Sequence, residues 1–260
     1  MSIVGALTAN PALVLRHRNL FLLSHMRANT SLFGHLIGSH PLVEGYYEMH
    51  IGYYSWKSLW RQKLRHFADH AAKPQARYMF DKVLHDGHHV APHLLQRTST
   101  RAIFMLRKPD QSVRSLVALF RQQNLALPEA TPEGATDYYV KRLQTLSTLA
   151  ESLSGRFFYL DAECLVERPD PTLAALSEWL GFAQRIPSTY ETFSNTGRGD
   201  AGDHSQRLKS GTIDRSRSDY SGLAFDESLL EQARAAYARH RAALLGRADA
   251  RVLTDDAHAT

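Results

Sequence analysis

Short apolar runs alternate with helix-like stretches along this chain, and that alternation restricts the fold more than any other feature. Apolar runs of strand length lie at residues 18–24, 102–106 and 156–160. Apolar side chains recur at helical spacing in residues 30–39, 109–120, 137–153 and 172–180. Strands that alternate with helices predict an α/β fold, with a parallel β-sheet flanked by helices in a three-layer arrangement.

Length and composition agree with one such domain over residues 1–260. Of the 260 residues, 43% are hydrophobic and 22% are charged, so the chain can bury a sizeable core. The formal net charge of +5 is too small for a histone-like polycation and suits a protein that binds a compact polyanion. A single cysteine, Cys164, excludes a disulfide framework and favours a reducing, cytoplasmic location.

The sequence argues against membrane insertion and nucleic-acid binding. No apolar run approaches the roughly 20 residues that a membrane-spanning helix needs. Basic residues of the predicted helix 226–245 are interleaved with Glu231 and have no aromatic platform beside them. Residues 194–221, rich in Gly, Asp, Ser and Arg, are predicted to form a long functional loop, and residues 247–260 a disordered tail.

Polar side chains suited to phosphate groups follow the first predicted strand. Arg27, Thr30 and Ser31 stand at the start of the next helix, and Ala28 and Asn29 contribute their backbone amides. The N-terminus of a helix binds anions because its first N–H groups have no partner within the helix. The junction has neither the glycines nor the lysine of a Walker A loop, which disfavours a kinase.

A second junction of the same kind follows the strand at 102–106. Arg107 leaves the end of this strand, Pro109 occupies the first turn of the next helix, and Ser115 lies eight residues after Arg107. Ligands of parallel α/β sheets bind at the carboxyl ends of strands. The two junctions in this order predict one site for a phosphate-bearing molecule.

The pair of junctions resembles the two nucleotide-binding motifs of the sulfotransferases that use 3′-phosphoadenosine 5′-phosphosulfate (PAPS). Residues 24–32 are similar to R-S-G-T-T/S-L, with Asn29 in place of the glycine, and residues 107–115 are similar to R-D-P-x-x-x-x-x-S, with Lys108 in place of Asp. The resemblance spans residues 19–213 and is typical of bacterial, cytosolic members. It implies the fold of that family, without a bound metal.

The resemblance also implies roles for individual residues. The junction at residues 27–31 would hold the 5′-phosphosulfate. Arg107 and Ser115 would hold the 3′-phosphate. Arg198 and Gly199, in the loop at 194–221, would close over the nucleotide.

Sulfuryl transfer to a hydroxyl or an amine needs a cation at the leaving oxygen and a base for the acceptor's proton. Arg27 is the candidate cation. Glu48 is the candidate base because it resembles a catalytic glutamate that several branches of the sulfotransferase family carry at about this point of the chain, one helix after the first junction. His50 competes with Glu48, since its ordinary pKa suits a base at neutral pH. Lys82, on a predicted inner strand, is a further catalytic candidate. A surface or salt-bridged position for Glu48 and an edge-strand position for Lys82 are the alternatives without function.

Several questions stay open at the level of sequence. The acceptor is a small molecule, a saccharide or a lipid, and the aromatic residues between 46 and 60 line its pocket or pack in the core. Four histidines at 85–93 include one pair at helical spacing, but Asp86 and Gly87 interrupt the cluster, so no metal site is expected. A kinase-like phosphotransferase and an inactive nucleotide-binding relative are the alternative functions. The oligomeric state is undetermined.

Overall fold

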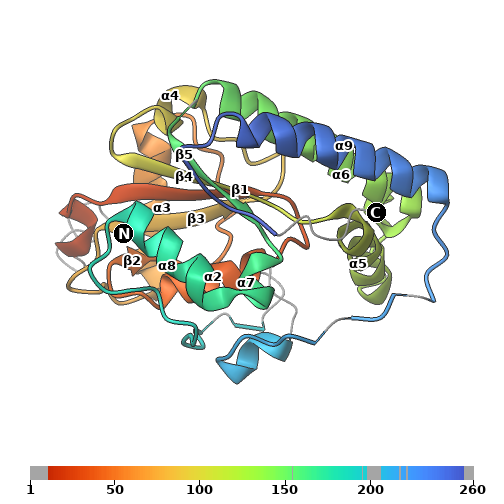
Figure 1. Cartoon of the computed structure of the whole chain (residues 1–260). Coiled ribbons are helices and arrows are strands. Elements are labelled where there is room, and N and C mark those ends of the chain that lie inside the picture. The colour runs from red at the N-terminus through yellow and green to blue at the C-terminus, as the bar shows by residue number, and fades with distance from the viewer. Residues whose placement is uncertain are drawn as a thin grey trace.

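A parallel β-sheet forms the centre of the computed structural model, which describes residues 11–153, 155–194, 196–197, 206–216, 218–220 and 222–254. Within these residues the sheet has six strands in the order β2-β3-β1-β4-β5-β6, all of them parallel (Figure 1). The strands are β1 (Arg18–Ser24), β2 (Val43–Glu44), β3 (Tyr78–Val83), β4 (Thr100–Leu106), β5 (Phe157–Asp161) and β6 (Ala250–Val252). The predicted α/β class with a parallel sheet is confirmed.

Helices cover both faces of the sheet. The α-helices are α2 (Thr30–Gly38), α3 (Trp56–Asp69), α4 (Pro92–Leu95), α5 (Pro109–Gln122), α6 (Pro132–Glu151), α7 (Cys164–Glu167), α8 (Pro169–Leu180) and α9 (Glu227–Leu245). Short 3₁₀ helices occur at η1 (Pro11–Val14), η2 (Pro128–Ala130) and η4 (Gln206–Ser210). Within the described part of the chain, no helix combines the length and the apolar character that crossing a membrane requires.

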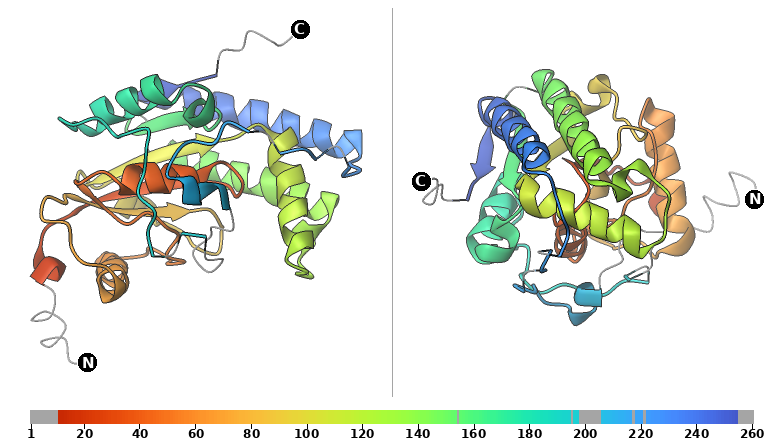
Figure 2. Two further views of the ribbon diagram at one scale, coloured as in Figure 1. Left: turned by 90° about the horizontal axis from the view of Figure 1, so that it is seen from below. Right: turned by 90° about the vertical axis from the view of Figure 1, so that its right-hand side faces the viewer.

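Alternation along the central strand β1 explains the three layers. Leu20 and Leu22 face α2 and α8, whereas Phe21 and Leu23 face the opposite layer, in which α5, α6 and α9 pack. Both faces of the strand are buried, so the strand is a continuous apolar run, as expected for a parallel sheet. Helices α6 and α9 lie side by side in the second layer (Figure 2).

Several boundaries follow the sequence signals closely. Pro109 occupies the first turn of α5, and Gly181 ends α8 in the left-handed conformation that glycine adopts without a steric penalty. The Asp226 side chain accepts a hydrogen bond from the backbone N–H of Ser228 and caps the start of α9. Helix α6 begins at Pro132, five residues earlier than the apolar pattern predicts, because Thr131 caps it there.

The prediction of a disordered tail from residue 247 is wrong for its first part. Residues 250–252 form β6, which pairs with β5 at the edge of the sheet. The backbone N–H of Thr254 then donates a hydrogen bond to the carboxylate of Asp161, at 2.9 Å. A three-residue strand at a sheet edge has too short an apolar pattern to be detected from sequence.

Candidate active site

The first junction between strand and helix has an unusual backbone. Arg27 and Asn29 both adopt positive φ angles, of 65° and 57°, which reverse the chain between β1 and α2. Asparagine tolerates this conformation better than most residues, which explains how it replaces glycine here. The Asn29 side-chain amide donates a hydrogen bond to the Ala162 carbonyl, at 3.2 Å, and thereby joins the loop to the end of β5. Thr30 and Ser31 occupy the first turn of α2.

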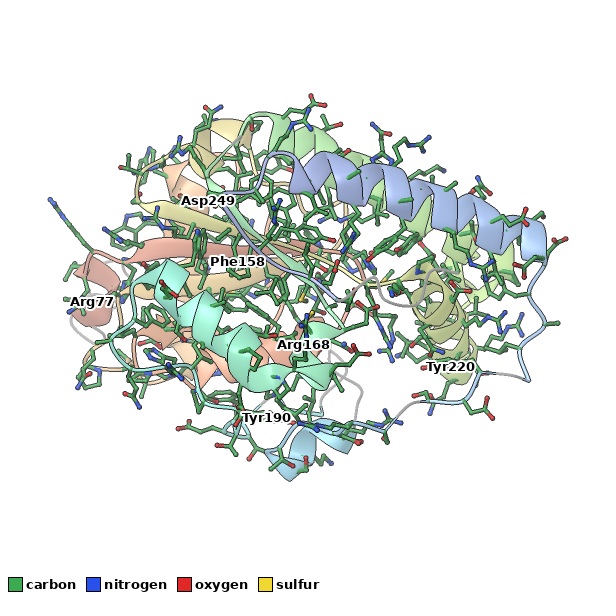
Figure 3. All side chains as sticks on the ribbon, viewed as in Figure 1. Arg77, Phe158, Arg168, Tyr190, Tyr220 and Asp249 are labelled. Carbon is green, nitrogen blue, oxygen red and sulfur yellow. The ribbon has the colours of Figure 1, made fainter. Side chains whose placement is uncertain are left out.

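The two predicted junctions meet in space. Arg27 Nε donates a hydrogen bond to Ser115 Oγ at 2.8 Å, and Arg107 donates from its guanidinium to the Arg27 carbonyl oxygen at 2.9 Å. Tyr220 lies on the segment that precedes α9 (Figure 3). Its hydroxyl also donates to Ser115 Oγ, at 2.9 Å. Two guanidinium groups and two hydroxyl groups therefore lie together at the carboxyl end of the sheet.

His25, which the sequence did not single out, holds the two junctions together. The backbone N–H of Arg107 donates to His25 Nε2 at 3.0 Å, so this nitrogen must carry the lone pair. Its other nitrogen, Nδ1, then carries the proton and donates to the Met26 carbonyl at 2.8 Å. Burial lowers the pKa of His25 to about 3, which keeps the ring neutral. A polar residue directly after a buried strand was the available signal.

Lys82 lies on β3 between β2 and β1, so the alternative of an edge-strand lysine is wrong. Its side chain is only 2% exposed, and Nζ donates a hydrogen bond to Ser31 Oγ at 3.1 Å. Its positive charge also acts on the carboxyl group of Glu48, whose pKa it lowers. Lys82 therefore connects the first turn of α2 with the candidate base.

Glu48 is a buried carboxyl group, so the alternative of a surface position is wrong. The residue is 4% exposed, and its Oε1 has no hydrogen-bond partner in the structure. Burial raises the pKa of Glu48 to about 7, against the positive charges of Lys82 and Arg142, which lower it. A carboxyl group that titrates near neutral pH suits a general base.

The position of Glu48 is fixed through its neighbour in the chain. The backbone N–H of Met49 donates to Asp81 Oδ1 at 3.0 Å, and Arg65 donates to the Met49 carbonyl at 2.6 Å. The Tyr53 hydroxyl donates to the other oxygen of Asp81, at 2.5 Å. Burial raises the pKa of Asp81 to about 7, so a second carboxyl group close to Glu48 titrates in the same range.

Three histidines surround the Glu48 carboxyl group. His50 Nδ1 and His85 Nε2 each lie 3.6 Å from Glu48 Oε1, and one ligand atom each of Glu48, His50 and His88 falls within 4.8 Å of the others. Burial, followed by the charge of Arg142, lowers the pKa of His85 to about 4. At neutral pH this ring is uncharged, so its approach to Glu48 is not an ion pair.

Arg142 is a further buried residue that the sequence pattern did not reveal. It lies on α6, is 2% exposed, and donates hydrogen bonds to the carbonyl oxygens of Ser24 and Val83, at 2.9 and 2.6 Å. These carbonyls are at or next to the carboxyl ends of β1 and β3. The guanidinium also pairs with Asp86 at 2.6 Å. Nothing in the apolar spacing of a helix indicates which of its arginines points inward.

The remaining predictions have different outcomes. The aromatic residues between 46 and 60 divide: Tyr46, Tyr47 and Tyr53 pack in the core, whereas Tyr54 and Trp56 are exposed. Ala28 is fully buried in the core that α2 shares with the sheet. Arg198 and Gly199 lie outside the described residues.

No family model and no curated protein matches the sequence. Solved structures do share its architecture. The sulfotransferase domain from the curacin biosynthetic pathway is 18% identical, with a TM-score of 0.61 over 86% of this chain and 97% of that domain. The fold is that of sulfotransferase domains. The sulfotransferase domain of the Synechococcus PCC 7002 olefin synthase agrees, at 17% identity and a TM-score of 0.55, over 85% of this chain and 94% of that one. The sulfotransferase fold expected from the two junctions is thus confirmed.

Proposed function

We propose that the protein transfers a sulfuryl group from PAPS to a hydroxyl group of a small acceptor. The observation that carries this proposal is the meeting of the two junctions, in which Arg27 Nε bonds Ser115 Oγ and Arg107 bonds the Arg27 carbonyl. The sulfotransferase fold supports it, and so does the resemblance of residues 24–32 and 107–115 to the nucleotide motifs of that family.

The residues present fit a nucleotide that carries phosphate groups at both the 3′ and the 5′ position of its ribose. Arg107 Nε is buried and has no hydrogen-bond partner in the structure, although burial of an unpaired guanidinium N–H is costly. An anion beside Ser115 would accept from this N–H and from the Arg27 guanidinium. This position suits the 3′-phosphate. The first turn of α2, with Thr30 and Ser31, suits the 5′-phosphosulfate.

Arg27 was expected at the 5′-phosphosulfate and at the leaving oxygen, but its contacts support a role at the opposite end of the nucleotide from Lys82. The Arg27 side chain bonds Ser115, on the side proposed for the 3′-phosphate, whereas Lys82 bonds Ser31 and acts on Glu48. Lys82 is therefore the residue that stabilises negative charge on the leaving phosphate oxygen. PAPS supplies the sulfuryl group that is transferred.

Glu48 acts as the general base. Its carboxylate accepts the proton of the acceptor hydroxyl while the new oxygen–sulfur bond forms and the bond from sulfur to the phosphate oxygen breaks. His50, the competing candidate, lies 3.6 Å from Glu48 Oε1 and has a side chain that is 37% exposed, so it is less enclosed than the carboxyl group. Burial of the base excludes water from the proton transfer.

This function is tested by measuring how fast PAPS is converted to the product 3′-phosphoadenosine 5′-phosphate (PAP) in the presence of a panel of alcohols, phenols and sugars. We expect release that depends on an acceptor, and a decrease of about 10²- to 10⁴-fold in Glu48→Gln at unchanged affinity for PAP. The variant Glu151→Gln is the control, because Glu151 is exposed at the end of α6. Equal rates in wild type and Glu48→Gln contradict the assignment of the base.

A further inference from the structure

The group of Glu48, His50 and His88 has the composition of a transition-metal site. It was not foreseen because the cluster at 85–93 lacks metal-ligand spacing by itself. The fold adds two ligands from a distant segment, the loop between β2 and α3. One potential ligand atom of each of the three residues lies within 4.8 Å of the others.

The distances are those of ligands around a shared cation rather than those of hydrogen bonds. Within the group, Glu48 Oε1 lies 3.6 Å from His50 Nδ1, too long for a hydrogen bond, and the ligand atom of His88 lies within 4.8 Å of the other two. Ligand atoms at about 2.0–2.1 Å from a tetrahedral zinc ion are roughly 3.3 Å apart. A small movement of the exposed His50 and the half-buried His88 toward Glu48 would therefore close the group around a metal.

Two atoms of the group are buried polar atoms without a hydrogen bond. Glu48 Oε1 and His88 Nδ1 are buried, and neither has a hydrogen-bond partner. A buried carboxylate oxygen without a partner is costly unless it pairs with a cation or ligates a metal. His50, the third member, has a positive φ of 52°, a conformation that histidine seldom adopts and that sets the direction of its side chain.

We propose that Glu48, His50 and His88 bind Zn²⁺, and that bound zinc prevents Glu48 from accepting a proton. Two imidazoles and one carboxylate are the donor set of many three-ligand zinc sites, which leave the fourth position open. Imidazole ligands disfavour Mg²⁺ and Ca²⁺, which prefer oxygen. The inhibitory part rests on the proposed role of Glu48 as the base. The binding part stands without it.

Zinc binding is measured by competition with a chromogenic chelator, on protein first treated with EDTA. We expect one Zn²⁺ per chain, an affinity at least about tenfold lower in His88→Ala and in His50→Ala, and an unchanged affinity in His93→Ala. His93 is an exposed histidine of α4 outside the group. Co²⁺ in place of Zn²⁺ should give the intense visible absorption of a tetrahedral site in the wild type and in His93→Ala, but not in His50→Ala or His88→Ala.

Unfolding curves of each variant confirm that it is folded, and His50 tolerates replacement because its side chain is 37% exposed. Equal zinc affinity in the wild type, His88→Ala and His50→Ala overturns the site. In the transfer assay, zinc should stop the release of PAP in the wild type, and EDTA should restore it. Full activity of the zinc-loaded enzyme overturns the inhibitory part. A chain that binds zinc through these residues but never releases PAP refutes the proposed function and leaves the zinc site intact.

Discussion

The buried carboxyl group of Glu48 should make the folded protein less stable at high pH. Its pKa rises from the ordinary value of 4.5 to about 7, mainly through burial. The folded state therefore holds its proton more tightly than the unfolded state does. The stabilisation is present in full below pH 4.5 and is lost as the pH rises to about 7. A change of one in pKa corresponds to about 1.4 kcal/mol, so the loss amounts to about 3 kcal/mol at pH 8.

The variant Glu48→Gln removes the charge and keeps the shape of the side chain. The amide of the glutamine stays uncharged from pH 4 to pH 8. We subtract the free energy of unfolding of the wild type from that of the variant. This difference should be about 3 kcal/mol higher at pH 8 than at pH 4, so the variant is relatively more stable at pH 8. The comparison between two pH values cancels any packing effect that does not depend on pH.

Urea denaturation at both pH values, with EDTA present, gives the required free energies. Glu151→Gln, an exchange at an exposed glutamate, should change the difference by less than about 0.5 kcal/mol. An effect of Glu48→Gln that is the same at pH 4 and pH 8 refutes the reasoning, because it would mean that the carboxyl group has an ordinary pKa.

Three further predictions concern the same site and its support. The rate of PAP release should rise with pH through about 7 as Glu48 loses its proton, and Lys82→Met should move this rise to higher pH because the lysine charge lowers the pKa of Glu48; an unmoved pH–rate profile in the variant contradicts this coupling. Asn29→Ala should lower the free energy of unfolding by about 1 kcal/mol more than Asn29→Gly does, because both variants lose the hydrogen bond to the Ala162 carbonyl but only alanine is strained at the φ of 57°. Calorimetry that shows equal melting of both variants contradicts this expectation. Asp161→Asn should lower the free energy of unfolding, measured by urea denaturation, by about 3–5 kcal/mol, because the fully buried carboxylate accepts two hydrogen bonds from the Arg241 guanidinium. The control Asp137→Asn, at an exposed position, should leave it almost unchanged.

The sequence predicted the elements with strong apolar periodicity and missed those that depend on distant contacts. The boundaries of β1, α5 and α8 follow local signals, namely an apolar run, a proline and a glycine. Strand β6 is three residues long and exists because it pairs with β5. Helix α3 (Trp56–Asp69) was not predicted, and only its aromatic residues were noted. Its buried residues are Gln62, His66 and Phe67, which do not form an apolar stripe that can be recognised in the sequence.

The candidate site shows the same division. Arg27, Arg107 and Ser115 could be selected because each belongs to a motif with a fixed spacing. His25 and Arg142 act through backbone atoms of other strands, so their roles depend on tertiary structure. The group of Glu48, His50 and His88 joins two segments that are about 40 residues apart in the chain, which no local pattern can indicate.

Calorimetric titration with PAP, compared with ATP–magnesium, tests the central claim most directly. We predict that PAP binds, that adenosine 5′-monophosphate binds more weakly because it lacks the 3′-phosphate, and that Arg107→Ala weakens PAP by roughly 10- to 150-fold, the equivalent of about 1.5–3 kcal/mol for a charged hydrogen bond. In the variant the preference for PAP over the monophosphate should decrease by a similar factor. Tight binding of ATP–magnesium without binding of PAP contradicts the account and favours a phosphotransferase.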